Sequence, residues 1–207
     1  MYVTRITCEN LRTISEVSVD LCVPTPGSAR PDDGGPLPNV TLLLGVNGSG
    51  KTTLIEQLIP RLTARGLKVS VIKHAHHSFD IDRPGKDSYR LREAGCQEVL
   101  LLGEGRWALM HELRGAEEPP LPYLLGRLQH CDLVLIEGFK QGDFPKLEVW
   151  RPSQGREMLW PHWPGIAAIA SDAPRPAHLP STLPWLDLHD AAALADFVLA
   201  HARPAAA

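Results

Sequence analysis

The sequence predicts an α/β fold of three layers, with helices on both faces of a mostly parallel sheet. Buried apolar runs typical of parallel strands alternate along the chain with stretches of helical periodicity. A glycine-rich loop at residues 45–52 separates the first such strand from the first helix. A later apolar strand, residues 132–138, carries the acid Glu137 near its end. Together these features predict the fold of the phosphate-loop (P-loop) nucleoside triphosphatases.

The loop Gly45-Val46-Asn47-Gly48-Ser49-Gly50-Lys51-Thr52 matches the Walker A pattern G-x-x-x-x-G-K-[ST] at every fixed position. The run Val40–Leu44 precedes it as a buried strand, and a helix follows from Thr52 to about Arg65. In this context backbone N–H groups surround a phosphate, the lysine reaches the β- and γ-phosphates, and the hydroxyl ligates Mg²⁺. The context disfavours the alternative, a glycine-rich turn that binds nothing. We assign nucleotide binding to Gly45, Asn47, Gly48, Ser49, Gly50, Lys51, Thr52 and Thr53, with Lys51 also catalytic and Thr52 a metal ligand.

Composition narrows the class of protein. The 207 residues suit one domain with a small appendage, and the net charge of −3 does not favour a nucleic-acid partner. No apolar run approaches ~20 residues, so we expect no membrane span. No signal-peptide pattern is present, and none of the four cysteines forms a C-x-x-C pair. We therefore expect free thiols and a cytoplasmic protein.

Histidines and aspartates follow the second predicted strand, Leu67–Lys73, at the sheet edge where the P-loop lies. The segment contains His74, His76, His77, Asp80 and Asp82, in a spacing that matches no standard zinc site. We interpret it as a segment beside Mg²⁺ and the nucleotide, with Asp80 as a metal ligand and Asp82 in the catalytic set. A solvated loop remains an alternative.

Two further acids stand at strand ends. Glu137 stands near the end of the run Asp132–Gly138 as a Walker B acid does, and either binds Mg²⁺ through water or polarises the attacking water. Gly138 would leave room for the γ-phosphate. Asp172 follows the strand Ile166–Ala170, where its carboxylate could accept hydrogen bonds from guanine N1 and N2. That role favours GTP over ATP, while an acid that caps a turn is the alternative.

The remaining elements follow from local patterns. At the N-terminus we expect strands at 2–8 and 16–21, a turn at 9–14 and a proline-rich loop at 24–38. Further on we expect helices at 89–94, 117–129 and 190–202, a hairpin or neighbouring strands at 98–103 and 106–111, strands at 146–151 and 185–188, and a loop at 152–164. The domains predicted are an extension, residues 1–38, and a P-loop GTP-binding domain, residues 39–203.

Five segments resemble the molybdopterin-guanine dinucleotide biosynthesis protein B (MobB) family, with a likeness from about Asn39 to Phe197. They are Lys73-His74-Ala75-His76-His77, Asp82-Arg83-Pro84-Gly85-Lys86-Asp87-Ser88, Arg106-Trp107-Ala108-Leu109-Met110, Glu137-Gly138-Phe139-Lys140 and Ala170-Ser171-Asp172.

This resemblance implies a homodimer that binds GTP, hydrolyses it weakly, and assists a partner nucleotidyltransferase in attaching GMP to the molybdenum cofactor. It makes residues 45–53 the GTP phosphate site, Glu137 the Walker B acid and Asp172 the candidate guanine-binding residue. Residues 1–38 depart from the family pattern, which begins almost at the P-loop strand.

Two other classes of protein remain as alternatives. The opening strand, Glu9-Asn10-Leu11-Arg12 and second strand resemble the first hairpin of RecF/SMC-like ATPases. That class needs a loop of the L-S-G-G-Q type, which this chain lacks. A small-molecule kinase would need an arginine-rich lid, for which Lys86, Arg90 and Arg92 are the candidates.

Overall fold

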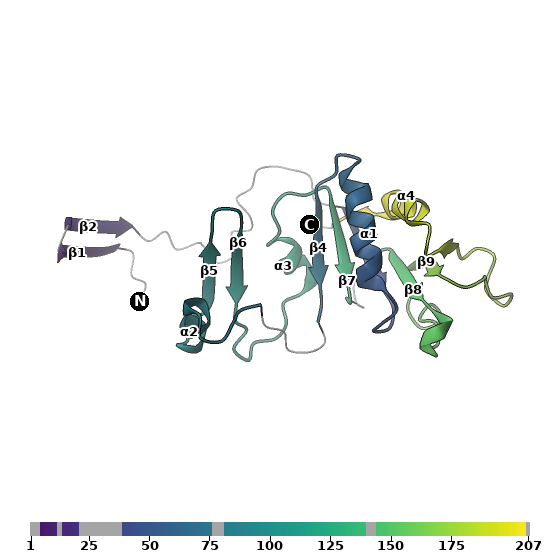
Figure 1. Cartoon of the computed structure of the whole chain (residues 1–207), viewed down its shortest axis with the longest axis horizontal. Helices are drawn as coiled ribbons and strands as arrows, with labels where there is room; N and C mark the ends of the chain where they lie inside the picture. Colours follow the sequence, from purple (N-terminus) through teal and green to yellow (C-terminus); the bar gives the residue numbers. More distant parts are fainter. Residues whose placement is uncertain (1–4, 12–13, 21–38, 76–80, 140–143, 206–207) are drawn as a thin grey trace. The chain divides into compact units, whose positions relative to one another are not determined.

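The computed structural model describes residues 5–11, 14–20, 39–75, 81–139 and 144–205 (Figure 1). The chain forms two compact units, residues 1–35 and 36–207. In the first unit β1 (Arg5–Leu11) pairs antiparallel with β2 (Ile14–Asp20), as the predicted hairpin requires. The predicted turn at 9–14 is too long, because Glu9 pairs with Glu16 and Leu11 with Ile14.

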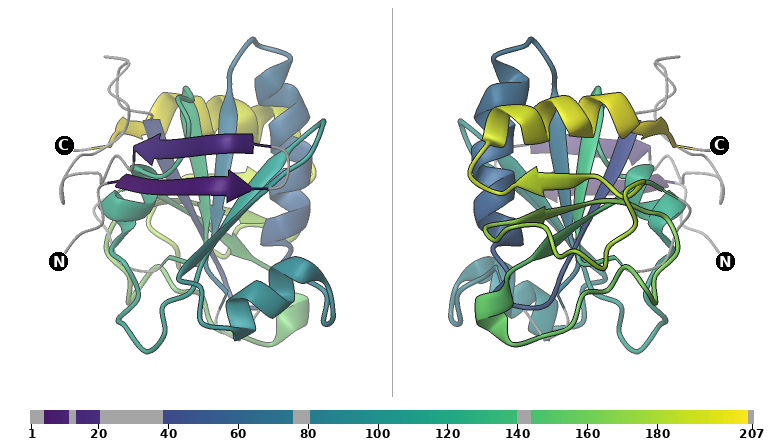
Figure 2. Two further views of the ribbon diagram at one scale, coloured as in Figure 1. Left: turned by 90° about the vertical axis from the view of Figure 1, so that its left-hand side faces the viewer. Right: turned by 90° about the vertical axis from the view of Figure 1, so that its right-hand side faces the viewer.

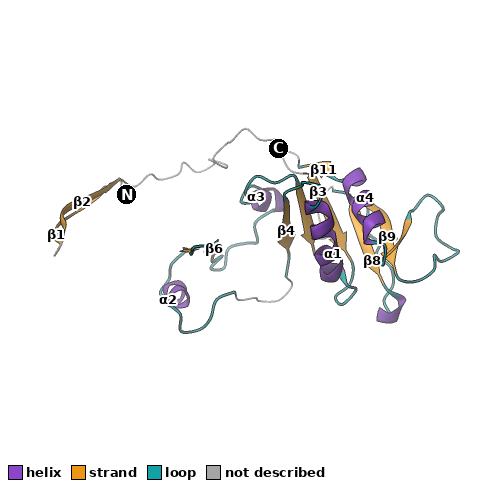
Figure 3. Ribbon diagram, turned by 45° about the horizontal axis from the view of Figure 1, so that its top comes forward, coloured by secondary structure: helices purple, strands orange, loops and turns teal. Residues whose placement is uncertain are grey.

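The second unit is built on a seven-stranded sheet with six parallel strands in the order β10-β9-β8-β3-β7-β4 (Figure 3). A short antiparallel strand, β11, pairs with β3 and was not predicted from the sequence. The strands are β3 (Asn39–Leu44), β4 (Val69–Lys73), β7 (Leu133–Glu137), β8 (Lys146–Trp150), β9 (Ile166–Ser171), β10 (Trp185–Asp187) and β11 (Arg203–Pro204).

The strand register brings the site residues to one edge of this sheet. Glu137 at the end of β7 pairs with Leu43 of β3 on one side and with Lys73 of β4 on the other. Because the strands are parallel, their carboxyl ends open onto the loop that follows β3. The P-loop therefore lies beside Glu137 and Lys73, as the sequence predicted.

Helices cover both faces of the sheet. Helices α1 (Lys51–Thr63) and α4 (Ala191–His201) pack together on one face, and α3 (Leu121–Leu125) lies on the other (Figures 1 and 3). Successive side chains of β7 point to opposite faces of the sheet. Leu133 and Leu135 pack in the core on the α1 side, and Val134 and Ile136 pack in the core on the α3 side. The predicted three-layer α/β P-loop fold is thus confirmed.

Helix α3 is shorter than the predicted helix at 117–129. Pro120 precedes it with extended backbone, φ −67° and ψ 154°, so the helix begins only at Leu121. A proline at 119 or 120 removes the N–H that a helix through this point would need. The helix ends at the cap residue Gly126.

A second, two-stranded sheet consists of β5 (Glu98–Leu102) and β6 (Trp107–His111), which pair antiparallel as the predicted hairpin. Helix α2 (Asp87–Glu93) packs beside β5 (Figures 1 and 2). A short 3₁₀ turn, η1 (Pro152–Gln154), follows β8 within the predicted loop. Among the described residues, no helix combines the length and apolar character that crossing a membrane requires.

Candidate nucleotide-binding site

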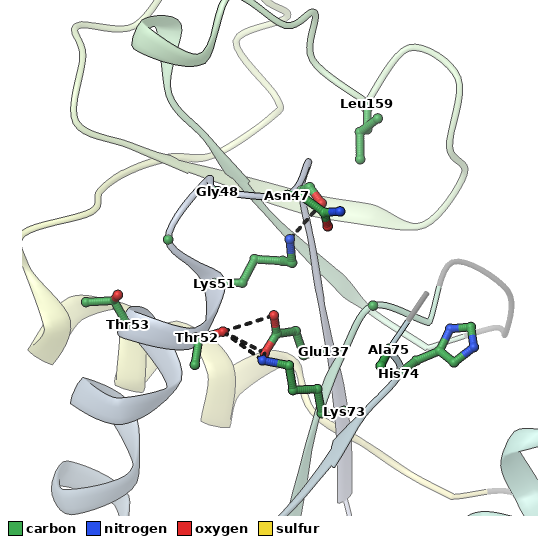
Figure 4. A pocket seen from close by; sticks show the side chains of 13 residues that line it. Asn47, Gly48, Lys51, Thr52, Thr53, Lys73, His74, Ala75, Glu137 and Leu159 are labelled. Atoms are coloured by element: carbon green, nitrogen blue, oxygen red, sulfur yellow. Dashed lines mark hydrogen bonds and ion pairs between the residues drawn. The ribbon is translucent and has the colours of Figure 1, made fainter. Parts of the chain in front are cut away.

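A pocket of about 460 Å³ opens at the carboxyl ends of β3, β4 and β7 (Figure 4). Most of its lining comes from the P-loop and the first turn of α1, and Leu159 joins it from the loop after β8. The lining residues are Gly45, Asn47, Gly48, Gly50, Lys51, Thr52, Thr53, Lys73, His74, Ala75, Glu137, Gly138 and Leu159. The structure thus gathers seven of the eight predicted loop residues, while Ser49 is fully buried beneath them.

The P-loop is held in a conformation that its glycines permit. Gly45 has φ +142°, and a Cβ there would lie 2.6 Å from Ser49 Oγ and closer still to the Val149 carbonyl oxygen. Lys51 is buried, and its ammonium donates to the carbonyl oxygens of Gly45 and Val46, each at 2.9 Å. The lysine charge therefore lies at the mouth of the loop, where a phosphate group would be bound.

Two of the three predicted metal ligands, Thr52 and Glu137, meet beside this lysine. Thr52 Oγ1 lies 3.0 Å from Glu137 Oε2 and 3.1 Å from Oε1, while Lys73 Nζ lies 3.3 Å from Thr52 Oγ1 and 3.5 Å from Glu137 Oε2 (Figure 4). A hydroxyl and a carboxylate are the hard oxygen ligands that Mg²⁺ takes, and the Lys73 ammonium group already lies within 3.5 Å of both. Thr53 points away from this cluster (Figure 4).

The oxygen ligands that the protein supplies are few. The described residues contain no group of three or more His, Cys, Asp or Glu side chains placed to hold a metal ion. Mg²⁺ in nucleotide sites typically takes one or two protein ligands and completes its shell with water and phosphate oxygens. Thr52 and Glu137 fit that arrangement, and they do not form a zinc cage.

His74 links β4 to β7 at the pocket wall. Its N–H donates to the Glu137 carbonyl at 2.8 Å, its Nε2 lies 3.0 Å from Glu118, and its ring lies 4.8 Å from that of Phe139. Gly138 has φ +92°, and a Cβ there would lie 2.7 Å from the His74 carbonyl oxygen. The close approach of β4 thus gives this glycine a structural reason besides the predicted space for phosphate.

Asp82 lies elsewhere in the second unit. Its carboxylate accepts from Ser88 Oγ at 2.8 Å and from the Arg83 N–H at 2.9 Å, and Arg92 Nε lies 3.4 Å away. Arg92 also donates to Glu112 at 2.8 Å, so both side chains anchor α2 to its surroundings. Asp82 does not line the pocket, and the structure does not bring it together with Glu137; its catalytic role stays a prediction. Asp80, His76 and His77 lie outside the described residues.

Asp172 is joined to the P-loop through an arginine that sequence reasoning did not single out. Arg151 donates through Nη1 to Asp172 Oδ2 at 2.5 Å and through Nε to the Ser49 carbonyl at 2.9 Å. In the turn that follows β9, Ser171 Oγ accepts the Ala173 N–H at 3.2 Å. A basic residue at the end of the strand 146–151 was the available signal, but nothing in the sequence places that strand next to the P-loop strand.

A second residue that the sequence did not indicate is Glu148 on β8. It is almost fully buried and accepts the N–H groups of Leu159 at 2.6 Å and Trp160 at 3.0 Å. Burial raises the pKa of this carboxyl above its ordinary value of 4.5, and the two hydrogen bonds oppose the rise. Glu148 thereby anchors the loop that carries Leu159 to the pocket.

Comparison with known proteins identifies the family. The model of the family "Molybdopterin guanine dinucleotide synthesis protein B" (MobB) matches residues 40–172. The chain belongs to the MobB family. It is 42% identical over 159 residues to the molybdopterin-guanine dinucleotide biosynthesis adapter protein of Escherichia coli K12, which covers 74% of this chain and 87% of that protein. The adapter protein of the same name from Haemophilus influenzae is 43% identical over 162 residues, which is 75% of this chain and 85% of that one.

Solved MobB structures share the fold. The crystal structure of Bacillus subtilis MobB superposes with a TM-score of 0.63 at 24% identity, covering 80% of this chain and 98% of that one. The MobB match begins in β3 and ends at Asp172, so it contains every residue predicted for the site. Residues 1–38 lie outside it.

Proposed function

We propose that this chain binds GTP and Mg²⁺ in the P-loop pocket, hydrolyses GTP slowly, and acts as an accessory protein in forming molybdopterin guanine dinucleotide. The observation that carries the proposal is the meeting of Thr52 and Glu137 at 3.0–3.1 Å beside the P-loop lysine, Lys51. Such a hydroxyl–carboxylate pair next to a lysine is what a Mg²⁺-nucleoside triphosphate needs.

Each group has a defined task in this proposal. The loop N–H groups and Lys51 bind the phosphates, and Thr52 and Glu137 hold the metal directly or through water. Bound Mg²⁺ supplies positive charge that stabilises the triphosphate and the charge that develops during its hydrolysis. Among the described residues that line the pocket, Glu137 is the only carboxylate, while Asp80, the other acid predicted to bind the metal, lies outside the described residues.

Asp172 gives the proposal its preference for guanine. Guanine presents N–H donors at N1 and N2 to a carboxylate, whereas adenine offers no such pair. Asp172 stands at the end of β9, which is two strands from the P-loop strand in the sheet order. Its link through Arg151 to Ser49 supports a base position beside the phosphate site.

The accessory role rests on the relatives, which are named adapter proteins of molybdopterin-guanine dinucleotide biosynthesis. We infer that the chain works beside a nucleotidyltransferase that attaches GMP to molybdopterin, and that molybdopterin is present in that assembly. A cytoplasmic location stays a prediction from the sequence.

We also propose that the chain is a homodimer through its second sheet. Val99 and Met110 on one face of the β5–β6 hairpin are buried. The other face carries Leu100, Leu102, Trp107 and Leu109, which are 60, 80, 50 and 41% exposed. A two-stranded sheet alone is marginally stable in water, so an apolar face of this kind favours burial against another surface. Because a two-fold interface uses the same patch twice, a second copy of the chain is the occupant we propose.

Calorimetric titration of the purified protein with GTP, ATP and xanthosine triphosphate, with and without Mg²⁺, tests the proposal. We expect GTP to bind more tightly than ATP, and Lys51→Ala to abolish binding of both. Asp172→Asn should weaken the binding of GTP and strengthen the binding of xanthosine triphosphate. In xanthine an oxygen replaces the N2 amino donor of guanine, and the amide of Asn can donate a hydrogen bond to that oxygen. Equal affinities for GTP and ATP would contradict the guanine assignment and favour the ATPase alternative.

A further inference from the structure

Arg151 connects two parts of the proposed site that are far apart in the sequence. It stands directly after β8 and lies 102 residues from Ser49 and 21 from Asp172. Its Nε donates to the Ser49 carbonyl at 2.9 Å, and its Nη1 donates to Asp172 Oδ2 at 2.5 Å. The side chains of Arg151 and Asp172 are 28% and 24% exposed, so water screens this ion pair only in part.

The guanidinium also packs against the backbone at the start of α1. A Cβ on Gly50 would lie 3.3 Å from both Nε and Nη2 of Arg151, and Gly50 itself has φ +96°. Gln154 makes a similar approach to Gly48, where a Cβ would lie 3.1 Å from its Oε1. Residues after β8 therefore support the P-loop, yet neither Arg151 nor Gln154 lines the pocket. Arg151 is placed to act on the site through its neighbours.

We propose that Arg151 is a positioning residue that couples guanine recognition by Asp172 to phosphate binding by the P-loop. The inference rests on the proposed GTP-binding function. By binding the Ser49 carbonyl and the Asp172 carboxylate at once, the guanidinium fixes the distance between the phosphate site and the base site. A carboxylate has about four acceptor positions, so Asp172 can bind Arg151 and still accept two hydrogen bonds from guanine.

The charge of Arg151 has a second consequence. A carboxylate close to a triphosphate is repelled by it, and a guanidinium bonded to that carboxylate offsets the repulsion. An arginine suits both tasks because its planar fork presents several N–H groups in fixed directions, whereas a lysine offers one compact ammonium group. Arg151→Lys should therefore keep the charge but lose the double contact.

Calorimetric titration of GTP and ATP against wild type, Arg151→Ala, Arg151→Lys, Asp172→Asn and the Arg151→Ala/Asp172→Asn double variant tests the coupling. We expect Arg151→Ala to weaken GTP binding about tenfold, as loss of one charge-assisted contact predicts. ATP binding should weaken less, so that the ratio of GTP to ATP affinity falls. Arg151→Lys should recover affinity in part but not selectivity. In the Asp172→Asn background, Arg151→Ala should no longer change the ratio of GTP to ATP affinity.

Arg156→Ala is the matched control, because it removes the same charge from an exposed residue of the loop that follows β8. Thermal melting checks that each variant is folded. If Arg151→Ala weakened the binding of GTP and ATP equally, Arg151 would only support the P-loop, and the proposed coupling would be overturned. Unchanged binding of both nucleotides would overturn it as well. A wild-type protein that does not prefer GTP would overturn the guanine assignment itself, and the coupling with it.

Discussion

Replacing Gly138 by alanine tests whether contact between β4 and β7 maintains the nucleotide site. Gly138 has φ +92°, and an alanine Cβ would lie 2.7 Å from the His74 carbonyl oxygen. That oxygen cannot retreat freely, because the His74 N–H is bonded to the Glu137 carbonyl at 2.8 Å. The positive φ costs about 1–2 kcal/mol for an L-residue, and displacing that hydrogen bond about 1 kcal/mol more. We expect Gly138→Ala to lower the free energy of unfolding by about 2–3 kcal/mol.

Gly66 provides the matched control. It follows α1 with φ +83°, and a Cβ there meets nothing within 4 Å. Gly66→Ala should therefore cost only the contribution of the positive φ, about 1–2 kcal/mol. The difference between the two variants isolates the contact with His74.

Urea denaturation followed by tryptophan fluorescence gives the free energies, and calorimetry gives the affinity for Mg²⁺-GTP. Gly138→Ala should also lower the affinity for Mg²⁺-GTP, because a shift of Glu137 or of the end of β4 disturbs the contacts among Glu137, Thr52 and Lys73. Gly66→Ala should leave that affinity unchanged. Equal destabilisation of the two variants, with equal nucleotide binding, would refute the reasoning.

Three further variants probe the metal ligands, the proposed dimer and the buried acid. Thr52→Ala should remove most of the Mg²⁺ dependence of GTP binding in calorimetry, while Thr53→Ala, whose side chain points away, should not; equal effects would exclude Thr52 as the metal ligand. Leu102→Glu, at a position 80% exposed, should halve the mass measured by light scattering, and an unchanged dimer would exclude this face. Glu148→Gln replaces the buried carboxyl by a neutral amide. Because burial raises the pKa of Glu148 in the folded state, the stabilisation that its protonated form gives is complete below pH 4.5 and is lost as pH rises. The free energy of unfolding of the wild type should therefore fall relative to that of the variant above pH 4.5, and parallel urea-denaturation profiles of the two proteins would contradict this.

The local patterns of the sequence predicted which residues of the P-loop and of β7 the structure brings together around the pocket. Strand β3, the P-loop and α1 are adjacent in the chain, so glycine positions and apolar periodicity specify their geometry without distant information. Glu137 could be placed beside the loop because parallel strands end at one edge of the sheet. The predicted length of α3 was wrong, because apolar spacing alone indicates a helix over 117–129 whereas the prolines at 119 and 120 prevent it from starting before Leu121.

Contacts that depend on strand order could not be predicted. Strand β8 comes after β7 in the chain but pairs with β3 in the sheet, and this places Arg151 against Ser49 and Gly50. The same neighbour relation places the Val149 carbonyl against Gly45. Asp82 shows the opposite case, since an acid predicted at the site is bound instead by Ser88 and Arg92.

The sequence by itself determined that this chain carries a P-loop followed by an acid at a strand end, because both depend on residue type and short spacing. The tertiary structure decided which side chains surround that loop. Only the sheet order brings Arg151 between Ser49 and Asp172, and only the close pairing of β4 and β7 makes Gly138 sterically necessary. These contacts join residues 21 to 102 positions apart or on different strands, where no local pattern records their distance.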